Sequence, residues 1–222
     1  MLTMLEEVVL IAIDEKTGRL RSAREYGTAY ALVGAVFFDL ALARRIDTDT
    51  EEIHVINAEP TGNPILDRVL ADMRARPEVK TVRGWIEAMF QSKIDFEGQA
   101  LASLIERGIL RHEKSKLLWI VDLERFPLIN NHPQEHVKVR LTRAILGNEI
   151  PDTRDIMLVS LAEPCGLLPC FLTITQLTVL GERIRIICNL ETISRKVAAA
   201  IAALDASLHQ GGIAASAANW MR

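Results

Sequence analysis

The sequence lacks a long uninterrupted run of apolar residues. Its longest apolar stretch, YALVGAVFFDLALA, is broken by Asp39 and is shorter than the roughly 20 residues that a membrane-spanning helix needs. Glu6 and Glu7 interrupt the first apolar run, and no basic segment precedes it, so a signal peptide is not expected. We therefore expect a soluble, cytoplasmic chain that lies at most on the surface of a membrane.

The sequence also lacks an excess of positive charge. The formal net charge is −3 over 222 residues, so no overall field attracts nucleic acid or anionic lipid, and such binding would need a local basic cluster. Cysteine is scarce as well: Cys165, Cys170 and Cys188 form no C-x-x-C pair. This pattern is typical of reduced thiols in the cytosol, which we interpret as buried structural residues.

Catalytic motifs are rare. The glycines are too scattered for a phosphate-binding loop, and no G-x-S-x-G is present. The stretch HPQEH, from His132 to His136, matches the H-x-x-E-H string of inverted zinc peptidases. Pro133 favours the first helical position, however, which would leave His132 outside the helix and direct the two side chains apart. We therefore expect no metal, no cofactor and no catalytic residue, and interpret the chain as non-enzymatic.

What the sequence does contain is helical periodicity. Thr3 and Glu6 form a capping-box pattern ahead of a helix that is apolar almost all round, which predicts a buried first helix. Strand is expected in a hairpin near 109–121, with a polar tip at Glu113–Lys116, and at 53–56. Further helices are predicted at 23–44, 64–75, 79–90, 95–107, from 133 onwards, and at 153–162, 171–181 and 191–208. The predicted fold is mainly α, with one domain over residues 1–208 and a disordered tail at 209–222.

A local basic cluster follows the first helix. It consists of Lys16, Arg19, Arg21 and Arg24. These residues are either solvated cations at helix ends or an anion site for a phosphorylated head group or a membrane surface.

A different class of function is suggested by the stretch LIERGILRHEKSKLLWIVD. Its helix, glycine and hairpin have the outline of a winged helix, which would bind nucleic acid. The helix before Gly108 carries Asp95, Glu97 and Glu106, a charge balance that disfavours DNA binding.

Five blocks of the sequence occur in the order and spacing of a known family. They are LTMLEEVVLIAIDEKTGRL, FFDLALARRI, PTGNPILDRVL, LIERGIL and FPLINN, and the similarity spans about residues 2–205. The chain thereby resembles the Golgi phosphoprotein 3 family of peripheral Golgi proteins, and the absence of a long basic N-terminal arm resembles its bacterial members. The resemblance implies a central helical bundle that is wrapped by amphipathic helices, with a hairpin projecting to one side.

The resemblance also implies a function. The family binds phosphatidylinositol 4-phosphate on a flat membrane-facing surface, and its eukaryotic members hold glycosyltransferases in the Golgi through their cytoplasmic tails. The positions that match the lipid-contacting residues of the family are Arg24, Val33, Ile94 and Glu97. Only one of the four is a cation, so we expect weak, salt-sensitive binding to anionic membranes rather than tight recognition of one phosphoinositide.

The expected protein is thus a peripheral adaptor, which would lie on the Golgi in a eukaryotic cell. The candidate anion-binding residues are Arg19, Arg21, Arg24 and Lys93. The expected partners are an anionic membrane or phosphoinositide head group, cytoplasmic tails of membrane proteins and a second copy of the chain, but not nucleic acid. A protein-binding oligomeric scaffold and a winged-helix-like nucleic-acid binder are the alternatives.

Overall fold

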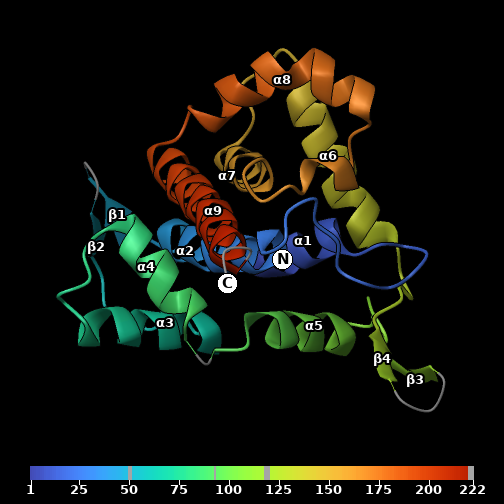
Figure 1. Cartoon of the computed structure of the whole chain (residues 1–222), viewed down its shortest axis with the longest axis horizontal. Helices are drawn as coiled ribbons and strands as arrows, with labels where there is room; N and C mark the ends of the chain where they lie inside the picture. Colours follow the sequence, from blue (N-terminus) through green and yellow to red (C-terminus); the bar gives the residue numbers. More distant parts are fainter. Residues whose placement is uncertain (50–51, 93, 118–120, 220–222) are drawn as a thin grey trace.

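The fold is mainly helical, which confirms the predicted class. The computed structural model describes residues 1–49, 52–92, 94–117 and 121–219. Two helices, α1 (Met4–Ala12) and α2 (Gly27–Leu42), lie side by side at the centre (Figure 1). One side of this pair is covered by α3 (Pro64–Ala75), α4 (Val82–Phe90) and α5 (Phe96–Glu106). The other is covered by α6 (His132–Leu146), α7 (Thr153–Ala162), α8 (Ile174–Cys188) and α9 (Thr192–Asn219).

Helix α1 is buried along its whole length, as its sequence predicts. It packs against α2, α5 and α6. The capping box is confirmed: the Thr3 hydroxyl accepts from the Glu6 backbone N–H at 3.1 Å, and the Glu6 carboxylate accepts from the Thr3 N–H at 2.7 Å. At the other end, the buried Gln134 amide of α6 donates to the carbonyl oxygens of Leu10 and Ile13, at 2.8 and 2.9 Å. Both ends of the helix are therefore held by side chains.

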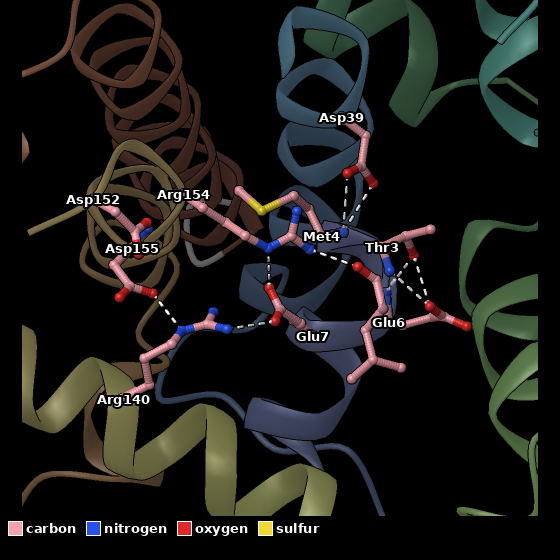
Figure 2. A network of polar contacts seen from close by, with 10 residues as sticks. Thr3, Met4, Glu6, Glu7, Asp39, Arg140, Asp152, Arg154 and Asp155 are labelled. Carbon is pink, nitrogen blue, oxygen red and sulfur yellow. Dashed lines mark hydrogen bonds and ion pairs between the residues drawn. The ribbon is translucent and has the colours of Figure 1, made fainter. Parts of the chain in front are cut away.

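Charged residues of the first turn of α1 join it to its neighbours (Figure 2). Glu7 is 3% exposed and pairs with Arg140 of α6 at 3.0 Å and with Arg154 of α7 at 2.9 Å. Arg140 also binds the buried carboxylate of Asp155 at 2.6 Å. From α2, Asp39 accepts from the Met4 N–H at 2.9 Å. Because each buried charge has a partner of opposite sign or a backbone donor, the network can lie inside the protein.

The adjacent carboxylate, Glu6, joins α1 to α5. It is 2% exposed, accepts a hydrogen bond from the Ser103 hydroxyl at 2.7 Å and pairs with Arg107 at 2.8 Å. Arg107 is itself exposed, but its charge is paired with a buried carboxylate, so it is not a free surface cation.

The strands differ from the prediction in two respects. β1 (Ile46–Thr48) pairs with β2 (Ile53–Val55) in a small antiparallel sheet, of which only the second strand was predicted. In the hairpin, β3 (Glu113–Leu117) pairs with β4 (Val121–Arg125), so placing the tip at Glu113–Lys116 is wrong. Cross-strand charge pairing explains the error: Lys114 lies 3.1 Å from Glu124, and such pairs stabilise a strand whose local sequence is as polar as a turn.

Two helix ends also differ from the prediction. α8 begins at Ile174, after a short 3₁₀ turn at Leu168–Cys170, and continues past Gly181 to Cys188. α9 continues beyond residue 208, the predicted end of this helix, to Asn219. Among the described residues, none of the helices combines the length and apolar character that crossing a bilayer requires.

Candidate functional site

The basic cluster lies on the loop between α1 and α2, which we call the basic loop (residues 14–25). Lys16 and Arg19 are exposed, and neither forms an ion pair within the described residues. Arg21 is also exposed, with its Nη2 3.1 Å from the Asp14 carboxylate. Hydrogen bonds from Thr17 lower the pKa of Asp14, and the positive charge of Arg21 lowers it to a smaller extent. This carboxylate therefore stays ionised and partly neutralises Arg21.

The conformation of the basic loop is fixed by backbone contacts. The Gly18 carbonyl accepts from the Phe126 N–H, just after β4, at 2.7 Å. Gly18 has φ +64°, and a Cβ there would lie 2.8 Å from the Pro127 backbone nitrogen. Near the end of the loop, the Ser22 hydroxyl donates to the Cys165 carbonyl at 2.7 Å. The backbone of the loop is therefore fixed, and its cations extend from a defined position on the surface.

Arg24 differs from the other cations of the loop in its ion-pair partner, which lies on α9. Its Nη1 is 2.6 Å from the Asp205 carboxylate on α9, and Asp205 is 5% exposed. A guanidinium held by a buried carboxylate is less available to an anionic ligand than a free one.

A cavity of about 290 Å³ lies between α2, the end of α4 and the start of α5, and we call it the α2–α5 cavity. It brings together Val33, Ile94 and Glu97, three of the four positions that the resemblance assigns to a lipid pocket. Arg19, Arg21 and Arg24 are not in its lining. The remaining predicted residue, Lys93, lies outside the described residues.

The charge of the α2–α5 cavity does not suit a phosphate. Its described charged residues are Asp95 and Glu97. Asp95 accepts from the Gly98 N–H at 2.8 Å and caps α5. Desolvation and the neighbouring charge of Asp95 raise the pKa of Glu97. Near a bound phosphate, two carboxylates would add repulsion to the cost of desolvation.

Two aromatic residues, Phe90 and Phe96, line the cavity. Behind the lining, the Phe90 ring stacks on Tyr30, with ring centroids 4.8 Å apart, and meets the Tyr26 ring edge-on at 5.8 Å. Apart from the two carboxylates, the described lining is otherwise apolar.

The HPQEH stretch has a different geometry from the predicted one. α6 begins at His132, so this residue is inside the helix, and the rings of His132 and His136 stack with centroids 6.5 Å apart. The expectation that Pro133 directs the side chains apart is therefore wrong, because the proline occupies the second helical position. Glu135 accepts from Asn131 at 2.7 Å. Within the described residues, no three His, Cys, Asp or Glu side chains gather as metal ligands would.

The cysteines are poorly suited to nucleophilic chemistry. Burial raises the pKa of the Cys165, Cys170 and Cys188 thiols, in the case of Cys188 to about 11. Since the thiolate is the nucleophile, these residues are largely unreactive at neutral pH.

Comparison with known proteins gives a match over most of the chain. The model of the family Golgi phosphoprotein 3 (GPP34) matches residues 4–204. Vacuolar protein sorting-associated protein 74 of Eremothecium gossypii is 27% identical over 170 residues, and its namesake in Schizosaccharomyces pombe is 25% identical over 170 residues. Each alignment covers 67% of this chain and 50% of the relative. The chain thus spans about half the length of the curated relatives it matches.

Proposed function

Because this chain belongs to the Golgi phosphoprotein 3 family, we propose that it is a non-enzymatic peripheral adaptor that binds anionic membrane surfaces through the basic loop. The observation that carries the proposal is the exposure of Lys16, Arg19 and Arg21 on a loop whose backbone is fixed. Each basic side chain close to an anionic surface contributes about 1 kcal/mol. Lys16 and Arg19, with a smaller contribution from the partly neutralised Arg21, therefore give reversible attachment.

The proposal does not include tight recognition of phosphatidylinositol 4-phosphate. The α2–α5 cavity has two carboxylates where a phosphate site needs donors, and Arg24 is paired with Asp205. Binding by a few exposed cations should follow the charge of the membrane rather than the position of a phosphate on the ring.

The cellular role is proposed from the family and the relatives. The family name points to the Golgi, and both relatives are named for vacuolar protein sorting. We extend this to a role in sorting membrane proteins, in which cytoplasmic tails are the partners. A winged-helix function is less well supported. Asp95 caps α5, and Glu97 and Glu106 lie within it, so the helix that would read DNA is acidic. Arg107, just after this helix, is paired with Glu6.

The test is sedimentation with vesicles of phosphatidylcholine alone, with added phosphatidylserine, and with each phosphoinositide, at low salt and at about 1 M salt, where the Debye length falls to about 3 Å. We expect binding to every anionic vesicle at low salt and loss of most of it at high salt. The double variant Arg19→Glu with Arg21→Glu should bind the anionic vesicles more weakly at low salt.

The matched control is Arg74→Glu with Lys80→Glu, which makes the same change in net charge at exposed positions around α3, far from the basic loop (Figure 1). Equal loss in the two variants would show that only net charge matters. Absence of binding to any anionic vesicle would refute the membrane function and leave the protein-binding scaffold as the better interpretation.

A further inference from the structure

An open groove runs along the outer side of α6, with a volume of about 590 Å³. We call it the α6 groove. Val139, Arg143 and Leu146 lie in it at helical spacing, so they share one face of α6. Phe171, just before α8, also lines it. Val139 and Leu146 are 54% and 52% exposed, so this face of α6 presents two aliphatic side chains that no described part of the chain covers.

The charges in the α6 groove are of one sign. Its lining contains Lys138 and Arg143 and no carboxylate, but Lys138 is paired with Glu15 of the basic loop at 3.2 Å, so Arg143 is the cation that the groove offers to an occupant. Arg143 is exposed and forms no ion pair within the described residues, although it also lines a neighbouring cavity whose described lining includes Glu149, Asp152 and Asp155. This is the opposite of the α2–α5 cavity, whose described charges are both negative. The groove therefore suits an occupant that is both apolar and negatively charged.

Further aliphatic side chains are exposed near the groove. Ile150 is 79% exposed and lines a neighbouring cavity that shares Arg143 and Gly147 with the groove, and Ile174, three residues after Phe171, opens α8 and is 83% exposed. α8 contacts α6. A protein partner would need a matching hollow for each of these protruding side chains, whereas lipid tails rearrange around them. Apolar side chains with basic residues beside them are typical of surfaces that lie in the interface of a bilayer.

The basic loop lies next to the α6 groove. Lys138 of the groove is 3.2 Å from the Glu15 carboxylate of the loop. The Cys170 thiol, adjacent to Phe171 in the chain, donates to the Arg21 carbonyl at 3.7 Å. Figure 1 shows the loop passing beside the first half of α6. The exposed cations of the loop and those of the groove thus belong to neighbouring parts of one surface.

We propose that the α6 groove and the basic loop form a single docking face for an anionic lipid bilayer. The loop and Arg143 meet the head groups, and Val139 and Leu146 enter the boundary between head groups and acyl chains. This inference rests on the proposed function and states which face of the molecule meets the membrane. It implies that attachment has an apolar component in addition to the ionic one.

The test is vesicle sedimentation of the full chain with Val139→Asp and Leu146→Asp combined, on phosphatidylcholine vesicles with and without phosphatidylserine. Both positions are exposed, so the variant should fold, which circular dichroism checks. We expect affinity for the anionic vesicles to fall by about tenfold or more, because buried aliphatic area is lost and negative charge is added. The matched control is Leu42→Asp with Ile56→Asp, also exposed, at the far end of the molecule near β1 and β2 (Figure 1).

The possible outcomes are distinct. If the wild type binds anionic vesicles and the groove variant binds them equally well, or no worse than the control does, the docking face is wrong while the proposed function stands. If the wild type binds no anionic vesicle, both fail. If the wild type self-associates without lipid and the groove variant alone becomes monomeric by sedimentation velocity, a second copy occupies the groove and the lipid assignment is overturned. Loss of vesicle binding in the groove variant alone, with unchanged self-association, supports the proposal.

Discussion

At the scale of the residue, Gln134 is the member of the HPQEH stretch with a defined structural role. Its amide donates to the carbonyls of Leu10 and Ile13 at the end of α1. Gln134→Ala should lower the free energy of unfolding by about 1–3 kcal/mol, because two buried carbonyls lose their donor. Urea denaturation measures this. The control is His136→Ala, at an exposed position of the same helix. It should change the free energy of unfolding by no more than about 0.5 kcal/mol. Equal effects of the two substitutions would contradict the capping role.

Asp39 gives a prediction for the pH dependence of stability. Burial raises its pKa from 3.8 to about 6, despite the hydrogen bond from the Met4 N–H. The native state therefore holds this proton more tightly than the unfolded state, and the contribution of the group is largest below about pH 4 and is lost as the pH rises through 6.

Asp39→Asn removes this titration while keeping the shape of the side chain. The stability of the wild type relative to the variant should fall between pH 4 and pH 7 by up to about 3 kcal/mol, since one pKa unit corresponds to 1.36 kcal/mol. Denaturation of both proteins at a series of pH values measures the difference in their free energies of unfolding. The contributions of the other titrating groups are the same in both proteins and cancel in this difference. A difference that stays constant with pH would show that the pKa of Asp39 is ordinary.

Local residue patterns predict some of these contacts and not others. The capping box of Thr3 and Glu6 is readable because both partners lie within one turn of the helix. The partners of Glu7, which are Arg140 and Arg154, are distant in the chain, and no local pattern contains them. The sequence does contain one indication of these contacts. Two glutamates in an otherwise apolar, buried helix require cations from other parts of the chain as partners.

At the scale of the element, the basic loop depends on Gly18. Gly18→Ala introduces a side chain at φ +64° and places its Cβ 2.8 Å from the Pro127 nitrogen. We expect a loss of about 1–2 kcal/mol in stability from the backbone strain alone. The loop should also shift from the segment after β4, which would reduce vesicle binding without removing a charge.

Gly62→Ala is the control for this variant. Gly62 also has a positive φ, +83°, but nothing lies within 4 Å of the place that its Cβ would take. Thermal denaturation of the two variants measures the backbone strain, which both variants share. Vesicle sedimentation measures the effect of the displaced loop, which we expect in Gly18→Ala alone. Weakened vesicle binding in both variants would contradict a specific role for the position of the loop.

Helical periodicity predicted most of the elements because each amphipathic helix carries its own burial pattern. The errors arose where long-range pairing decides the structure. β1 has no alternating pattern of its own and is held by β2, and the polar residues of β3 are stabilised by β4. The helix predicted at 171–181 is too short at its end, because α8 continues through Gly181 to Cys188.

At the scale of the whole molecule, the negative charge of the α2–α5 cavity should keep the protein from recognising one particular phosphoinositide. Ile94→Arg with Glu97→Arg would replace a repulsive surface by two donors at positions that the resemblance assigns to lipid contact. We expect the variant to prefer phosphatidylinositol 4-phosphate over phosphoinositide isomers of equal charge, because arginines in a pocket bind a phosphate with defined geometry. Vesicle sedimentation in the presence of competing head groups measures the preference.

The control for this variant places the same change of charge outside the cavity, with Glu59→Arg and Ile56→Arg, both at exposed positions. If it gains the same preference, the cavity has no part in selecting the lipid. The sequence predicted the cavity only through the resemblance, since its lining comes from three helical segments separated along the chain. The association of the basic loop with α6 could not be predicted, because it depends on how distant segments pack.

The central position of α1 has a consequence for how the chain is made. This helix leaves the ribosome before its partners on α5, α6 and α7 exist. At roughly 5–20 residues per second, Arg154 follows about 7 to 30 s later. During that interval an apolar helix with two glutamates lacks the cations that it later meets. The completion of the bundle is therefore a late, non-local event, and the nascent chain up to α5 is a natural client for chaperones that shield apolar helices.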